Sequence, residues 1–182
     1  NVMHPRLGFD LLAAQIEAAH EIGVKTPVYI SAGLDEKYVL DHSDWLARNL
    51  DQSTQWKKNL ATPGYHRLCF NSGYFEKLLS HIEEVVKNYD ADGIFLDITG
   101  VRLCWCANCT KILREEGKSV EDESAVRDLA ERTYKKYYEA VERTVHKIKP
   151  DMPIFHNSGN IQRGRRDLAR ANTHLEIESL PT

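Results

Sequence analysis

Hydrophobic and polar positions along this chain repeat with two different periods. Five segments are predicted to be helical from the spacing of their apolar residues; they span 9–23, 36–50, 74–89, 107–117 and 126–148. Residues 163–171 are expected to form a short polar helix or a loop. Four short segments between them are rich in β-branched and aromatic residues, which predicts buried strands; they span 24–33, 91–98, 152–159 and 173–179. Helices and strands therefore alternate along the whole chain.

This alternation indicates parallel strands joined by crossover helices. Both an open doubly wound sheet and a (β/α)8 barrel fit it. No glycine-rich phosphate turn follows any predicted strand, which weakens a nucleotide-binding interpretation. Polar residues instead collect where the strands end, at the edge that barrels use for active sites; they are Ser31, Asp97, His156, Asn157, Ser158, Glu176 and Glu178.

We therefore expect an α/β fold, a partial (β/α)8 TIM barrel with about four parallel strands and crossover helices. Residues 1–182 are expected to form a single domain, a fragment of such a barrel. The remaining strands would lie outside this chain or come from a partner copy, which leaves a homo-oligomer open.

The composition is that of an ordinary globular domain, with 182 residues, 42% of them hydrophobic, and a net charge of −3. Nucleic-acid-binding domains usually carry a basic excess, so no nucleic-acid partner is expected. No apolar run approaches the roughly 18 residues of a membrane helix, so no membrane partner is expected. The N-terminus shows no signal-peptide pattern. The chain is interpreted as a piece of a longer protein, and the cytoplasm is favoured as its compartment.

The four cysteines follow a pattern typical of metal ligands. Cys104, Cys106 and Cys109 form a C-x-C-x-x-C run, and Cys69 lies in the loop before the preceding helix. Structural zinc takes four ligands in a tetrahedron, with thiolates at about 2.3 Å. We expect a structural zinc ion that joins two strand-end loops. Disulfides and unliganded or redox-active thiols remain open as alternatives.

Two carboxylates suggest hydrolytic chemistry. Asp97 ends the strand predicted at 91–98, and His174, Glu176 and Glu178 share one face of the last predicted strand. Two carboxylates from different strands are the minimum for glycoside hydrolysis. We expect Asp97 to be the nucleophile and Glu178 the acid/base of a retaining reaction. Alternatively, Asp97 caps its loop and both glutamates are solvated on an edge strand.

Further polar and aromatic residues suit contacts with a carbohydrate substrate. Asn71, His156, Asn157 and Glu176 are expected to hydrogen-bond sugar hydroxyls, and Tyr74 is expected to stack on a sugar face.

Two sequence stretches also resemble a known family. "RLCFNSGYFEKL" followed by "DGIFLDI" and "CWCANC" resembles the hypothetical glycosyl hydrolase family six group, bacterial proteins grouped with barrel glycosidases. The resemblance runs from "HPRLGFDLL" to "THLEIESLPT", nearly the whole chain. It implies a (β/α)8 barrel whose later strands are missing here.

Shorter motifs resemble two other glycosidase families. "YHRLCFN" and "CWCANC" are similar to the cysteine motifs of family 42 β-galactosidases, whose four thiols bind zinc. That family has an Asn-Glu pair at the strand tip, where this chain has "LDIT", so its acid/base role does not transfer. The tip is instead similar to that of α-L-fucosidases, whose nucleophile is an Asp ending a "D-G-x-x-x-D" strand. That similarity implies Asp97 as nucleophile.

The sequence thus predicts a glycoside hydrolase-like catalytic domain fragment with a structural four-cysteine zinc site. Two alternatives belong to other classes of protein. One is a catalytically inactive carbohydrate-binding barrel, and the other is a zinc-stabilised interaction module.

Overall fold

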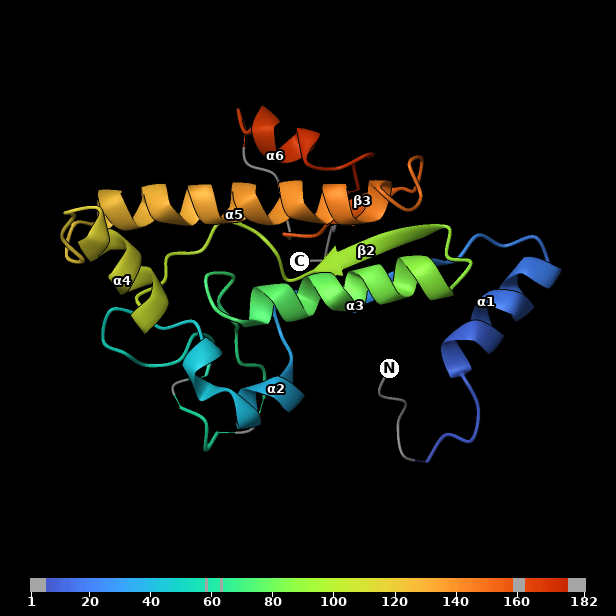
Figure 1. The fold of residues 1–182 in the computed structure, drawn as a ribbon, viewed down its shortest axis with the longest axis horizontal. Helices are drawn as coiled ribbons and strands as arrows, with labels where there is room; N and C mark the ends of the chain where they lie inside the picture. Colours follow the sequence, from blue (N-terminus) through green and yellow to red (C-terminus); the bar gives the residue numbers. More distant parts are fainter. Residues whose placement is uncertain (1–5, 58, 63, 159–162, 177–182) are drawn as a thin grey trace, which may run out of the picture.

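The computed structural model describes residues 6–57, 59–62, 64–158 and 163–176 (Figure 1). All five segments predicted as helical contain a helix, and the segment left open as helix or loop also contains one. The elements in chain order are α1 (Leu11–Glu21), β1 (Pro27–Ser31), α2 (Glu36–Asp41), the 3-10 helix η1 (Ser43–Trp45), α3 (Tyr74–Asn88), β2 (Gly93–Asp97), α4 (Ala107–Glu115), α5 (Glu123–His146), β3 (Ile154–His156) and α6 (Arg166–Arg170).

The strands form a parallel sheet in the order β1-β2-β3. The fold is therefore α/β with crossover helices, as predicted, but the described residues contain three strands rather than about four. Within the segment predicted as the fourth strand, residues 173–176 are not strand, and 177–179 lie outside the described residues. Thr173 nevertheless lies along the outer edge of β3, because its backbone amide donates to the carbonyl of Ile154 at 3.0 Å.

The two faces of the sheet have different surroundings. Side chains alternate along a strand, and the register aligns Ile30 with Leu96 and His156. These residues, together with Val28, Ile94 and Ile154, form the helix-covered face. The opposite side, here called the open face, carries Pro27, Tyr29, Phe95, Asp97, Phe155 and Asn157.

Helices α3 and α5 cover the first of these faces and lie side by side in Figure 1. Their apolar residues form one core with the strands; it includes Phe75, Leu78, Ile82 and Val86 of α3, Tyr134, Tyr137, Val141 and Val145 of α5, and Val28, Ile94, Leu96 and Ile154 of the sheet. Spacing of three and four residues puts each helical set on one side of its helix.

Local signals explain where several helices begin and end. Asp10, Asp35 and Asp122 are N-caps whose carboxylates accept backbone N–H groups of the first turn. Gly23 has a φ of 74° and ends α1 in the left-handed conformation. The helix predicted over 36–50 stops early, because the following backbone leaves the helix to pair with a distant loop. There the amide of Ala47 donates to the carbonyl of Arg67.

The helices of the described part of the chain include no segment that is both long and apolar enough to cross a bilayer.

His156 is the clearest correction to the expected site residues. It was expected among the sugar contacts, but it lies on the helix-covered face and is 3% exposed. Its Nδ1 is 3.2 Å from the hydroxyl of Tyr137 on α5. Burial lowers the pKa of His156 to about 3. The alternation of side chains allows only one of His156 and Asn157 to face outward, and it is Asn157.

The buried imidazole predicts a pH-dependent stability. The unfolded chain binds a proton at His156 below about pH 6.5, but the folded chain does so only near pH 3, so stability falls as the pH drops through this window. Between pH 7 and pH 5, wild type should lose about 2 kcal/mol more unfolding free energy than His156→Phe. Urea unfolding at both pH values measures this difference, and equal losses in the two proteins would contradict it.

Candidate active site and metal centre

Asp97 occupies the C-terminal end of β2 on the open face of the sheet. Its Oδ2 accepts a hydrogen bond from the hydroxyl of Tyr29 at 2.7 Å. Its Oδ1 accepts from the Asn157 amide at 2.9 Å and from the backbone N–H of Ile98 at 2.8 Å. One of these partners lies in β1, one directly follows β2, and one directly follows β3. Both carboxylate oxygens are thereby oriented by the sheet itself.

The backbone around Asp97 is held under unusual constraint. Its carbonyl accepts from the backbone amides of Ala32 at 3.0 Å and Gly33 at 3.2 Å. Ile98 has a φ of 60°, which is rare for a β-branched residue. A Cβ on Gly33 would lie 2.2 Å from the carbonyl oxygen of Ile98, so only glycine fits there. Strained backbone of this kind clusters at functional sites.

An open hollow of about 590 Å³ lies over the open face. Asp97 borders it together with Asn157 and Glu176, and the other lining residues are Pro27, Tyr29, Phe95 and Phe155. The ring centroids of Tyr29 and Phe95 are 5.8 Å apart, and those of Phe95 and Phe155 are 5.1 Å apart. The hollow thus combines an apolar aromatic floor with two carboxylates and an amide at its border, as ligand sites usually do.

The structure brings together some of the predicted site residues. Asp97, Asn157 and Glu176 share the hollow, and Glu176 Oε1 is 2.6 Å from Nε2 of His174. Glu178, expected to be the acid/base, lies outside the described residues. Tyr29 was not among the expected site residues, because a tyrosine within a predicted strand is usually interpreted as a core residue. Its position two residues before Ser31 was the available signal, since Ser31 pairs with Asp97.

Two other expected sugar contacts lie elsewhere, and the structure corrects their placement. Tyr74 is 2% exposed, and its hydroxyl donates to the carbonyl of Ala32 at 3.1 Å. Asn71 does not border the hollow, and its side-chain amide donates to Thr133 on α5 at 2.8 Å. Neither residue lines the open face, because Asn71 lies in the loop before α3 and Tyr74 is the first residue of α3, which packs on the other side of the sheet.

The four cysteines converge although Cys69 is distant in sequence. All are buried, and their sulfur atoms lie within 4.8 Å of one another. Four sulfurs at about 2.3 Å from a shared tetrahedral ion would be about 3.8 Å apart. The observed cluster fits that size, and the cysteines are free thiols rather than disulfides. The chemistry of this donor set suits a thiophilic ion such as zinc.

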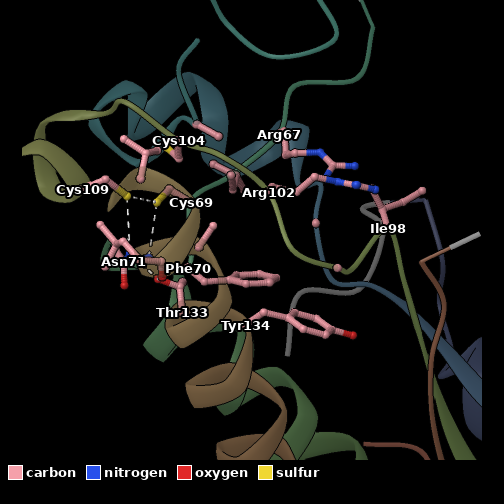
Figure 2. Close-up of a pocket in the computed structure, with 17 residues that line it drawn as sticks. Arg67, Cys69, Phe70, Asn71, Ile98, Arg102, Cys104, Cys109, Thr133 and Tyr134 are labelled. Carbon is pink, nitrogen blue, oxygen red and sulfur yellow. Dashed lines mark hydrogen bonds between the residues drawn. The ribbon is translucent and has the colours of Figure 1, made fainter. Parts of the chain in front are cut away.

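Asn71 supports the sulfurs from outside the cluster. Its side-chain amide donates to the sulfur of Cys109 at 3.4 Å, and its backbone N–H donates to that of Cys69 at 3.4 Å. Figure 2 shows these contacts beside the Cys69–Cys109 pair, with Thr133 below. Such N–H donors stabilise thiolate charge and orient the ligands, as surrounding groups do in metal sites. Asn71 therefore belongs to the cysteine cluster.

Without a cation between them, the four thiols disfavour one another's ionisation. Hydrogen bonds to Cys104, Cys106 and Cys109, with burial, raise the pKa of the Cys69 thiol well above its ordinary value. Hydrogen bonds from Cys104, Cys109 and Cys69 lower the pKa of Cys106. Ionisation of some of the thiols thus makes ionisation of the others less favourable, and a divalent cation is the group that lets all four ionise together.

The loops around the cluster have few regular elements of their own. Trp105, between two of the cysteines, is held by its indole N–H to the carbonyl of Val120 at 2.9 Å. Gln55 donates to the carbonyl of Leu103 at 2.7 Å, which ties the long loop after η1 to the loop after β2. A small apolar cluster that includes Leu113, Val126 and Leu129 packs against the cysteines. These contacts make the cysteine cluster the junction of both strand-end loops.

The fold and the site define the class: a glycoside hydrolase-like domain. The profile of the family described as hypothetical glycosyl hydrolase 6 matches residues 1–98, more than half of the chain. The chain belongs to this family, as the sequence motifs implied. No curated protein sequence matches the chain.

Solved structures of glycosidases are similar to this chain in fold. The chain is 47% identical to α-L-fucosidase isoenzyme 2 from Paenibacillus thiaminolyticus, with a TM-score of 0.98. The match covers 100% of this chain and 28% of the fucosidase. A β-galactosidase from the haloarchaeon Halorubrum lacusprofundi is 16% identical, with a TM-score of 0.71, over 97% of this chain and 33% of that one. A β-galactosidase from Bacillus circulans is 12% identical, with a TM-score of 0.72, over 100% and 34%. The latter two are similar in fold, and this chain spans about a third or less of each match.

The cysteine cluster predicts a bound metal that supports stability. Protein produced with zinc under reducing conditions should contain about one zinc per chain by elemental analysis, because four thiolates complete one tetrahedral shell. Cys106→Ser should lose most of the metal and lower the thermal unfolding midpoint. Lys111→Ala, on the exposed side of α4, is the matched control and should change neither. Full zinc occupancy in Cys106→Ser, or its absence from wild type, would contradict this prediction.

Proposed function

We propose that this chain is part of a (β/α)8 glycoside hydrolase that cleaves a glycosidic bond with retention of configuration, with Asp97 as its nucleophile. The observation that carries the proposal is the carboxylate of Asp97 at a strand end, on the open face, bordering the hollow. In a closed barrel of parallel strands, the active site lies at this end.

The partial-barrel interpretation rests on the open face. Tyr29 is 57% exposed there, and Phe95 beside it is half-buried, although both sit in strands of a parallel sheet. Parallel sheets are ordinarily covered on both sides. Further strands that closed the barrel would cover these rings and turn the open face inward. The β-galactosidases that match in fold, each about three times as long as the matched part, support this reading.

Asp97 is equipped for the nucleophilic role by its position. Hydrogen bonds from Tyr29, Asn157 and the Ile98 amide fix the direction of its carboxylate. A nucleophile gains much of its rate from such prior orientation toward the reacting carbon. Only the Tyr29 and Asn157 bonds come from side chains at the hollow, so they can readjust when a sugar binds.

In the proposed reaction, Asp97 attacks the anomeric carbon while an acid protonates the leaving oxygen, which gives a covalent glycosyl-enzyme. Water then attacks the same carbon, and the acid, now a base, takes its proton. We assign the acid/base to Glu178. Retention requires the two carboxyl groups to be about 5–5.5 Å apart. Asn157 and Glu176 would hydrogen-bond sugar hydroxyls, and the aromatic floor would contact the apolar face of the ring.

We infer that the substrate is an α-L-fucoside. The support is the 47% identity to an α-L-fucosidase over the whole of this chain. The hollow is also mainly apolar, with Asp97, Asn157 and Glu176 as the polar residues at its border. A deoxy sugar, which exposes a methyl group in place of one hydroxyl, suits such a surface.

In this proposal Cys69, Cys104, Cys106 and Cys109 hold a structural zinc ion. The ion supplies cross-linking rather than catalysis, because four thiolates leave no position for water. The cysteines join the loop between η1 and α3 to the segment after β2, and so brace the end of the sheet that carries Asp97.

The test is the hydrolysis of 4-nitrophenyl α-L-fucoside by the intact protein. Asp97→Asn should lower kcat/KM by about 10³-fold or more, because the amide cannot form the glycosyl-enzyme, while the unfolding midpoint stays near that of wild type. Asp128→Asn, an exposed change on α5, is the matched control and should retain full activity. Azide should restore turnover to Asp97→Gly and give a fucosyl azide of inverted configuration.

Undiminished activity in Asp97→Asn would remove this residue from the mechanism. Binding of fucose by wild type without turnover of any aryl glycoside would instead identify an inactive carbohydrate-binding barrel.

A further inference from the structure

Two arginines share a recess next to the cysteine cluster. Arg67, in the loop before α3, is only 4% exposed, whereas Arg102, in the loop after β2, is exposed at the mouth of the recess. Figure 2 shows both guanidinium groups beside Ile98. Burial, and then the charge of Arg102, lower the pKa of Arg67 to about 10, so the two cations lie within each other's field.

Neither arginine has an acidic partner among the described residues. No described carboxylate lies within ion-pair distance of either one, and Nε of Arg67 is a buried donor without a hydrogen-bond partner. Its guanidinium lies 4.7 Å from the ring centroid of Trp56, a contact with an aromatic face rather than with a negative charge. A buried cation without a counter-charge is costly, and a second cation nearby adds to the cost.

The carboxylates around the recess already pair with other cationic side chains. Glu131 and Asp167 bind Arg165, Glu123 binds Arg127, and the carboxylate of Glu36 binds His66. The cysteine sulfurs do not serve as the counter-charge either. In Figure 2 they lie at the opposite end of the recess, and both guanidinium groups point away from them. The excess positive charge is therefore concentrated where Arg67 and Arg102 meet.

The recess contains about 40 Å³ of free space and opens to solvent where Arg102 is exposed. A carboxylate group or part of a sulfate can therefore approach the two guanidinium groups from that side. Gly100, which borders the recess, has a φ of 117°, a backbone conformation that favours glycine. Guanidinium groups bind carboxylate and sulfate oxygens through paired N–H donors.

We propose that Arg67 and Arg102 form an oxyanion-binding site that takes a carboxylate or sulfate group between the two guanidiniums. The anion either comes from solution, free or as a substituent on a saccharide, or is a carboxylate side chain from another part of the same protein. The site stands apart from the hollow that contains Asp97 and is independent of the proposed hydrolysis.

The experiment is thermal unfolding of the intact protein in sodium sulfate against sodium chloride of equal ionic strength. The variants are Arg67→Met and Arg102→Met, which keep an apolar stem, with Arg143→Met on the exposed side of α5 as the matched control. A free anion should raise the wild-type midpoint saturably, by about 3 °C or more, and raise that of Arg143→Met equally. Both recess variants should lose this increment. Any increase in the midpoint that sulfate still causes in them is its general effect on protein stability.

An internal carboxylate gives a different result. Wild type then shows no sulfate-specific increment, and both recess variants unfold at lower temperature than Arg143→Met, because each leaves that carboxylate without a partner. Arg102→Met is the decisive variant for an internal carboxylate, because Arg67→Met also loses the contact of Arg67 with Trp56. The proposal is overturned if sulfate has no specific effect and Arg102→Met is as stable as wild type or more stable, the result expected when two cations simply repel each other.

Discussion

The pairing of β1 with β2 at their C-terminal ends is the constraint on which the rest of this structure depends. There the carbonyl of Asp97 accepts the amides of Ala32 and Gly33, and Gly33 approaches the backbone of Ile98 too closely for any side chain. This close contact sets the height of Asp97 relative to Tyr29, whose hydroxyl reaches its carboxylate. It also sets the starting points of the two loops that carry the cysteines and the paired arginines.

Those two loops show how a site is built where regular structure is sparse. Loops have little core of their own, and theirs comes from the buried cysteines packed on Leu113, Val126 and Leu129. Asn71 links the sulfurs to Thr133 on α5, so the cluster is tied to the helix layer as well as to the loops. The cysteine cluster therefore connects the two loops to each other and to α5.

Charge is distributed unevenly around this end of the molecule. The net charge of −3 gives no hint of a basic site, yet two arginines meet in a recess without an acid among the described residues. On α5 and α6, by contrast, Arg165 is matched by Glu131 and Asp167. Composition averages over such local differences, and only the fold places like charges together.

The sequence by itself determined the alternation of helices and strands, the parallel direction of the sheet and the family, because period, caps and motifs are local in the chain. It also singled out Asp97 and the four thiols, since such residues at such spacings are seldom accidental. Tertiary structure decided which side of a strand each residue faces. A one-residue difference sends His156 into the core and Asn157 to Asp97, and no local pattern marks that choice. It also moved Asn71 and Tyr74 from the expected sugar site to the sulfurs and the core. Loop paths depend on contacts between residues far apart in sequence, which no spacing along the chain encodes.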